Sequence, residues 1–154
     1  MSKIAVFPGS FDPITLGHLN IIERALPLFD KIIIAIGSNS LKSGYFTLEQ
    51  RLKWLQEIYG NEKNVVIESY EGLTIDFCKR NHAKYILRGL RGVTDYEYEK
   101  VIAQTNKTMY PEIETIFILS APEFSHISST IVKEVLRHKG DISKLVPIVV
   151  TRGA

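Results

Sequence analysis

Five short runs of apolar, mostly β-branched residues alternate along the chain with longer segments of helical spacing. Runs of this length and composition are typical of strands that are buried on both faces of a sheet. The runs cover residues 4–7, 32–36, 65–67, 85–87 and 116–119. Strand–helix alternation of this kind predicts an α/β fold with parallel strands and right-handed crossovers. We therefore expect a single Rossmann-like, doubly wound domain over residues 1–154, with a five-stranded parallel sheet.

The intervening segments carry their own helix signals. Apolar residues share one face over residues 19–29 and again over residues 48–59. Thr47 and Thr94 are each followed three residues later by Gln or Glu, the capping-box spacing, and both are predicted to begin a helix. Residues 141–147 are predicted to form a closing turn. In a doubly wound sheet the ligand lies beyond the carboxyl ends of the strands, so the loops after the first, fourth and fifth strands are the candidate site.

Composition excludes several classes of partner. Among 154 residues the net charge is only +2 and no dense run of Lys or Arg occurs, which argues against a nucleic-acid partner. No apolar run approaches the roughly 20 residues that span a bilayer. The chain begins without the pattern of a signal peptide, so we expect a cytoplasmic protein. The single cysteine, Cys78, lies in a segment typical of a packed helix and is expected to be a structural thiol.

The loop after the first strand has the strongest functional signal. Its sequence, Gly-Ser-Phe-Asp-Pro-Ile-Thr-Leu-Gly-His over residues 9–18, leads from a strand through a turn into a helix. Free backbone N–H groups and the positive end of a helix dipole together favour an anion, and phosphate is the expected one. His18 falls in the first turn of that helix, where its imidazole can donate a hydrogen bond to the same phosphate.

Two later loops add candidate anion-binding groups. Arg88 and Arg91 follow the fourth strand, and guanidinium forks suit phosphate oxygens. The alternative is that they pair with carboxylates such as Asp95. After the fifth strand, residues 125–130 crowd hydroxyl groups before another helix, which indicates either an N-cap at Ser128 or Ser129 alone or a second anion site.

The remaining polar residues are less specific. Lys42 follows the second strand and could reach the same crevice, although a lone lysine there is more often a solvated surface residue. The other histidines form no metal-ligand spacing, so no protein-bound metal is expected. The chain also lacks the Gly-x-x-x-x-Gly-Lys-Ser/Thr loop, the Gly-x-Gly-x-x-Gly turn and the serine elbow, so its phosphates must be held by another device.

Three motifs together carry a family resemblance. The stretch 9–18 resembles the signature of the nucleotidyltransferase superfamily. The Arg-Gly-Leu-Arg loop at 88–91, the acidic and aromatic segment at 95–99, and the Ile-Ser-Ser-Thr-x-Val-Lys stretch at 127–133 resemble, more narrowly, the bacterial phosphopantetheine adenylyltransferases. The match extends from residue 4 to about residue 147. Ser10, where the family often has threonine, keeps the hydroxyl group.

This resemblance implies transfer of AMP from ATP to 4′-phosphopantetheine, which gives dephospho-coenzyme A and pyrophosphate in the penultimate step of coenzyme A biosynthesis. It implies Mg²⁺ accompanying ATP and a homohexamer, a dimer of trimers, and it leaves feedback binding of coenzyme A open. Two alternatives remain at this stage. One is a sibling nucleotidyltransferase with another acceptor, such as nicotinamide mononucleotide, and the other is a module that senses ATP without turning it over.

The resemblance also assigns roles to residues. His18, Lys42 and Arg91 would be catalytic, with His18 at the α-phosphate. The acceptor would contact Ser10, Lys42, Leu73, Thr74 and Arg88. The nucleotide would contact Ser10, Phe11, His18, Gly89, Leu90, Arg91, Glu99, Phe124, Ser125, His126, Ile127, Ser128, Ser129 and Thr130.

Overall fold

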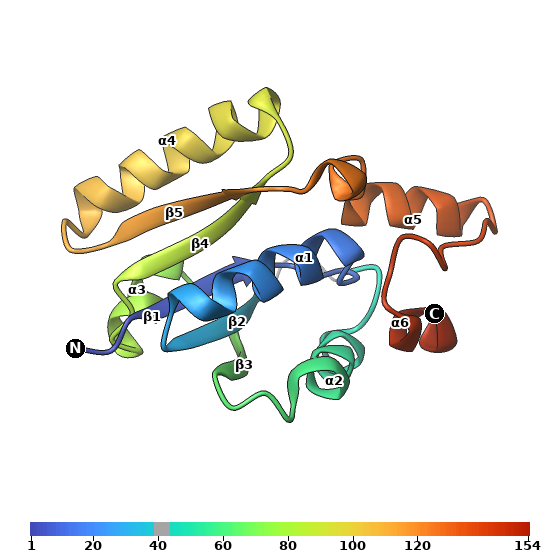
Figure 1. Cartoon of the computed structure of the whole chain (residues 1–154), viewed down its shortest axis with the longest axis horizontal. Helices are drawn as coiled ribbons and strands as arrows, with labels where there is room; N and C mark the ends of the chain where they lie inside the picture. Colours follow the sequence, from blue (N-terminus) through green and yellow to red (C-terminus); the bar gives the residue numbers. More distant parts are fainter. Residues whose placement is uncertain (39–43) are drawn as a thin grey trace.

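The computed structural model describes residues 1–38 and 44–154 and contains a five-stranded, fully parallel sheet (Figure 1). The strand order is β3-β2-β1-β4-β5, so the order reverses between β1 and β4. This confirms the predicted α/β fold. All five predicted strands are present, as β1 Ile4–Gly9, β2 Lys31–Gly37, β3 Val65–Tyr70, β4 Tyr85–Leu90 and β5 Glu114–Leu119.

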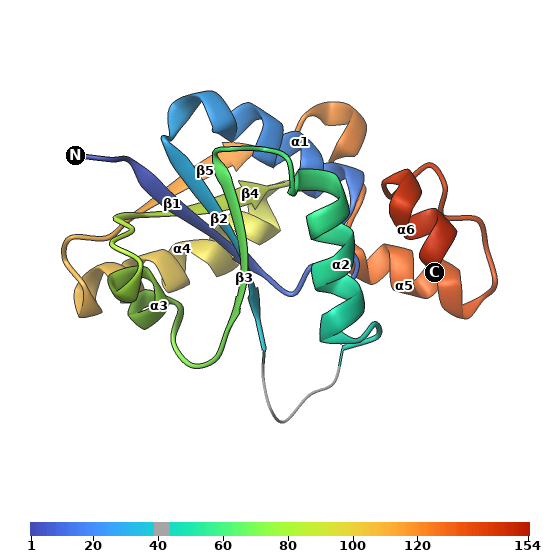
Figure 2. The same cartoon turned by 90° about the horizontal axis from the view of Figure 1, so that it is seen from below.

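Helices cover both faces of the sheet. They are α1 Leu16–Ala25, α2 Leu48–Tyr59, α3 Thr74–Arg80, α4 Val93–Met109, α5 Ser129–Arg137 and α6 Ile148–Gly153, with short 3₁₀ turns at Leu26–Leu28 and Pro122–Phe124. Figure 2 shows the sheet between α1 on one side and α3 and α4 on the other. No helix within the described ranges is long and apolar enough to cross a membrane.

The strands β1 to β4 send alternate side chains into two separate cores, as the two-residue period of a strand requires. Phe7 of β1 faces the larger core, which the buried faces of α1, α2, α5 and α6 complete. Its neighbour Val6 faces the smaller core, together with Ile86 of β4. Cys78 on α3 is buried in the smaller core, where burial raises the pKa of its thiol to about 12. The expectation of a packed structural thiol is confirmed.

Helix boundaries confirm some local predictions and correct others. Thr47 is the N-cap of α2, and its hydroxyl accepts from the N–H of Gln50 at 3.1 Å, as predicted. Thr94 is not an N-cap: α4 begins at Val93, two residues earlier than predicted, because Asp95 accepts from the N–H of Arg91 and Gly92 takes the N-cap position.

Of two further predictions of local structure, one needs correction and one is confirmed. The helix predicted over residues 19–29 ends as an α-helix at Ala25, where Pro27 lacks the N–H needed to continue it. The closing turn predicted at 141–147 is confirmed, with the N–H of Leu145 donating to the carbonyl of Ile142, and it leads into the short helix α6, which packs against α2 through the larger core.

Candidate active site

The loop from β1 into α1 holds His18 in a single orientation. Thr15 is the N-cap of α1, and its hydroxyl accepts from the backbone N–H of His18. In return, the backbone N–H of Thr15 donates to Nδ1 of His18 at 3.0 Å. Because Nδ1 accepts this bond, the proton of the neutral ring lies on Nε2. The ring therefore has a fixed tautomer whose remaining N–H is free to donate.

His18 is held in its uncharged form. Its ring lies 4.9 Å from the ring of Phe11 and keeps a partly exposed edge toward a cavity. Burial, with smaller contributions from the charges of Arg88 and Arg91, lowers the pKa of His18 to about 4. At neutral pH this side chain carries no charge of its own and can only donate a hydrogen bond through Nε2.

Both arginines of the β4 loop are paired with carboxylates. Arg88 makes two bonds to Glu99 of α4, at 2.6 and 3.0 Å, and a third to the carbonyl of Pro8. Arg91 makes a similar two-pronged contact with Asp95, at 3.0 and 3.1 Å. The alternative expected for these arginines, pairing with carboxylates such as Asp95, is therefore found. Despite this pairing, both arginines still belong to the candidate site, because both line the cavity described next.

A first cavity of about 380 Å³ lies over the carboxyl ends of β1 and β4 and the starts of α1 and α5. At the α5 end, Ser128 is the N-cap, and its hydroxyl accepts from the N–H of Ile131 at 3.1 Å. The cavity brings together most of the residues expected around the nucleotide, namely Ser10, Phe11, His18, Gly89, Arg91, Glu99, Ile127, Ser128, Ser129 and Thr130.

A second cavity, of about 330 Å³, opens on the other face of the sheet. It includes Thr74, one of the residues expected around the acceptor. The hydroxyl groups of Thr74 and Tyr70 lie 2.7 Å apart, and the ring of Tyr70 stacks on Phe77. The two cavities share one wall at the tips of β1 and β4, formed by Pro8, Gly9, Ser10, Arg88 and Glu99.

Several lining residues of the second cavity were not predicted from the sequence. They are Tyr70 at the end of β3 and a stripe on α4 comprising Tyr98, Ile102, Ala103 and Asn106. Tyr70 could have been found from its place, since it ends a strand at the ligand edge of the sheet. The α4 residues could have been found from their spacing, because Tyr98, Ile102 and Asn106 follow one another at intervals of four residues and so share one helix face.

Other expected site residues are placed elsewhere. Leu73 is 54% exposed at the N-cap of α3 and lines neither cavity. The same two cavities also lack Leu90, Phe124, Ser125 and His126 in their linings. The loop 124–127 still contacts the site from behind, because a side chain at Gly17 would meet the carbonyl oxygens of Phe124 and Ile127. Lys42 lies outside the described residues.

Comparison with known proteins places this arrangement in a family. The cytidylyltransferase-like family matches residues 6–135. A phosphopantetheine adenylyltransferase of Christiangramia forsetii is 57% identical over 97% of this chain and 99% of its own length. The chain belongs to the phosphopantetheine adenylyltransferase family. The relatives of the same name from Flavobacterium psychrophilum and Leptospira biflexa are 56% and 51% identical, over 93% and 97% of this chain and 94% of their own lengths.

The same fold also occurs in a protein whose sequence is much less similar to that of this phosphopantetheine adenylyltransferase family member. A Vibrio parahaemolyticus crystal structure, provisionally assigned as a nicotinate-nucleotide adenylyltransferase, superimposes with a TM-score of 0.73 at 21% identity. The alignment covers 99% of this chain and 97% of the Vibrio chain. At that identity the likeness concerns the fold alone, and the predicted family resemblance is confirmed by the closer relatives.

Proposed function

We propose that this chain transfers AMP from ATP to 4′-phosphopantetheine, yielding dephospho-coenzyme A and pyrophosphate in the penultimate step of coenzyme A biosynthesis. The observation that carries this proposal is the shared wall between the two cavities. Two anionic substrates that occupy separate cavities can meet at Ser10 and Arg88, where the two linings overlap. Relatives at 51–57% identity that carry the name of this activity support it.

The nucleotide occupies the first cavity in this proposal. The starts of α1 and α5 both open on that cavity, and helix N-termini favour phosphate groups. His18 donates from Nε2 to an oxygen of the α-phosphate, and Arg91 leaves its contact with Asp95 to bind the polyphosphate. Ser128 and Thr130 add hydroxyl groups at the α5 end of the cavity.

The acceptor occupies the second cavity, with its phosphate at Arg88 on the shared wall. Its pantetheine arm then extends toward Thr74, Tyr98 and Asn106, which offer hydroxyl and amide groups to the amides of the arm. Lys42 joins Arg88 on the acceptor phosphate, an assignment that rests on the family pattern.

The chemistry requires no covalent enzyme intermediate. An oxygen of the acceptor phosphate attacks the α-phosphorus in line, a new P–O bond forms, and the bond to the leaving pyrophosphate breaks with its electron pair. The attacking oxygen is already ionised, so the protein aligns two anions and stabilises the charge that develops between them. The Nε2–H of His18 provides such a donor, and a donor of this kind contributes roughly 10²- to 10³-fold to the rate.

Mg²⁺ enters this proposal as part of the nucleotide substrate. Within the described residues no three His, Cys, Asp or Glu side chains gather to form a metal site. The donor set therefore suits a cation carried by ATP phosphates and water, the usual arrangement for Mg²⁺. When bound, that ion neutralises part of the charge on the phosphates.

We also propose that the chain assembles as a homohexamer, a dimer of trimers. Helix α4 supports an oligomer because only Glu99 of its residues is buried, while the apolar side chains of Val93, Val101 and Met109 are exposed. Exposed apolar side chains gathered along one element are typical of protein interfaces. Feedback by coenzyme A is a further proposal, since coenzyme A carries the pantetheine arm that the second cavity would hold.

One assay tests the function directly. The protein is mixed with ATP, Mg²⁺ and 4′-phosphopantetheine, and pyrophosphate release and dephospho-coenzyme A are measured together. Nicotinamide mononucleotide replaces the acceptor in a parallel reaction to test the sibling activity. Product with the second acceptor alone would overturn the proposal, and ATP binding without any product would favour a sensing module. The His18→Ala variant is expected to lower kcat roughly 10²-fold while ATP still binds.

A further inference from the structure

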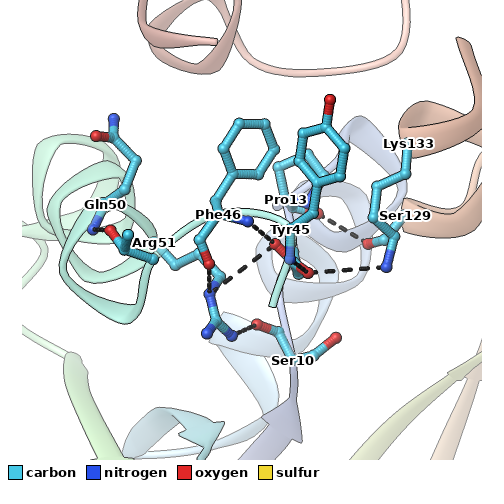
Figure 3. Close-up of polar contacts among 10 residues, drawn as sticks. Ser10, Pro13, Tyr45, Phe46, Gln50, Arg51, Ser129 and Lys133 are labelled. Atoms are coloured by element: carbon cyan, nitrogen blue, oxygen red, sulfur yellow. Dashed lines mark hydrogen bonds and ion pairs between the residues drawn. The ribbon is translucent and has the colours of Figure 1, made fainter. Parts of the chain in front are cut away.

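Figure 3 shows a cluster of polar contacts that joins the β1–α1 loop to α2 and α5. The charged residues of this cluster, Asp12, Arg51 and Lys133, line neither cavity. Asp12, only 4% exposed, is at its centre. Its carboxylate accepts from the backbone N–H groups of Tyr45 and Phe46, at 2.7 and 2.8 Å. Lys133 of α5 approaches the same carboxylate to 3.7 Å. Asp12 thereby joins the first loop, the segment before α2, and α5.

Arg51 of α2 completes this cluster and connects it to the site. Its guanidinium is buried and donates to two carbonyl groups, that of Ser10 at 2.8 Å through Nη1 and that of Phe46 at 3.1 Å through Nε. Nε also lies 4.0 Å from the carboxylate of Asp12, which balances its charge. Gly44 packs tightly against this pair. A Cβ atom added at Gly44 would lie only 2.9 Å from the Asp12 carboxylate and 3.1 Å from the Arg51 guanidinium.

The contact with Ser10 fixes the orientation of a peptide that faces the nucleotide cavity. In a trans peptide the carbonyl of one residue and the N–H of the next point in opposite directions. Arg51 draws the Ser10 carbonyl toward α2, so the N–H of Phe11 points away from α2. Phe11 itself lines the first cavity, and no hydrogen bond among the described residues uses its N–H.

The local backbone needs such support. Phe11 has a φ of +44°, in the left-handed region that residues with a side chain adopt only at a cost. Three contacts hold it there. The Phe11 ring packs edge-on against Phe7 at 5.4 Å, Ser129 donates to the carbonyl of Pro13 at 2.8 Å, and Arg51 holds the carbonyl of Ser10.

We propose that Arg51 is a positioning residue for nucleotidyl transfer: its bond to the Ser10 carbonyl turns the Phe11 N–H toward the transferring phosphate of the nucleotide. Asp12 in turn holds Arg51 and the Tyr45–Phe46 segment in register with the loop. The inference rests on the proposed function for its kinetic consequence, whereas the geometry of the loop stands independently of the acceptor.

Kinetics with two variants and a matched control test this role. Arg51→Lys keeps the charge but loses the planar fork that spans two carbonyls, and Arg51→Met loses both. Arg24→Met is the control, because Arg24 also donates to a distant carbonyl, that of Leu119 at 2.7 Å, but lines neither cavity. We expect kcat to fall roughly ten- to hundredfold in both Arg51 variants, with the KM for the acceptor within about twofold, and no change in the control.

A second readout separates positioning from stability. In protein labelled with ¹⁵N-phenylalanine, α,β-methylene-ATP with Mg²⁺ is expected to shift the Phe11 amide of the wild type and of Arg24→Met, but not that of Arg51→Lys. A wild-type kcat in folded Arg51→Lys, or a wild-type shift of its Phe11 amide, overturns the proposal. If Arg51→Met does not fold, Arg51→Lys decides alone. If no protein transfers AMP to 4′-phosphopantetheine, the proposed function fails, while the amide titration still decides the role of Arg51.

Discussion

The neutral state of His18 predicts a specific loss of stability in acid. The unfolded chain binds a proton at this histidine near pH 6.5, whereas the folded chain does so only near pH 4. Above pH 6.5 both states are neutral and the contribution of His18 is fully present. As the pH falls from 6.5 to 4, the unfolded state gains protons that the folded state does not, so folding weakens. The difference in pKa corresponds to about 3 kcal/mol of unfolding free energy.

Urea unfolding at pH 7, 6, 5 and 4 measures this effect in the wild type and in His18→Gln, which has no titrating ring. Between pH 7 and pH 4 the wild type is expected to lose about 3 kcal/mol more unfolding free energy than the His18→Gln variant. His138→Gln, which replaces an exposed histidine paired with Glu134, serves as the control and should keep the acid dependence that His18 contributes. A difference that stays constant across the range would refute the conclusion that the fold holds His18 neutral.

Three other predictions concern the two cavities and the core. Tyr70→Phe removes one hydroxyl of the Tyr70–Thr74 pair. Steady-state kinetics should show the KM for 4′-phosphopantetheine raised about fivefold and the KM for ATP unchanged. Equal effects on the two KM values would contradict the proposed assignment of the substrates to the cavities. Asp95→Asn removes a negative charge from the lining of the first cavity and frees Arg91, so the KM for ATP should fall about threefold. A rise in that KM would contradict competition between Asp95 and the phosphates for Arg91. Leu55→Ala empties a fully buried position in the larger core and should cost about 3 kcal/mol in urea unfolding, whereas a cost below about 1 kcal/mol would mean that the core closes around the gap.

The sequence was sufficient for features that depend on local pattern. The strands followed from apolar runs, and the position of His18 in the first turn of α1 followed from the turn residues before it. The cap at Thr47 was equally local. Thr94 failed for a physical reason, because the contact of Asp95 with the N–H of Arg91 governs where α4 begins. The capping-box spacing of Thr94 and Glu97 does not show that Asp95 will hold the N–H of Arg91 instead.

Residues brought together by tertiary packing were beyond sequence reasoning. Arg51 lies in the first turn of α2 and belongs to no motif, yet its guanidinium reaches the carbonyl of Ser10 across 41 residues of chain. The place of Tyr70 at a strand end and the helix face of Asn106 can be inferred from the sequence, but that both line one cavity cannot. Their roles depend on how helices pack against the sheet, which the pattern of apolar residues leaves undetermined.

In the proposed reaction, the reversal of strand order between β1 and β4 places the two substrates on opposite faces of one sheet. Phe7 on the nucleotide side belongs to one core and Ile86 on the acceptor side to the other. Substitutions around Tyr70, Thr74 or Asn106 can therefore reshape the acceptor cavity without disturbing the packing that supports His18. Homologous enzymes with this architecture can therefore change their acceptor through substitutions on one face of the sheet, while the residues that bind the nucleotide on the other face stay the same.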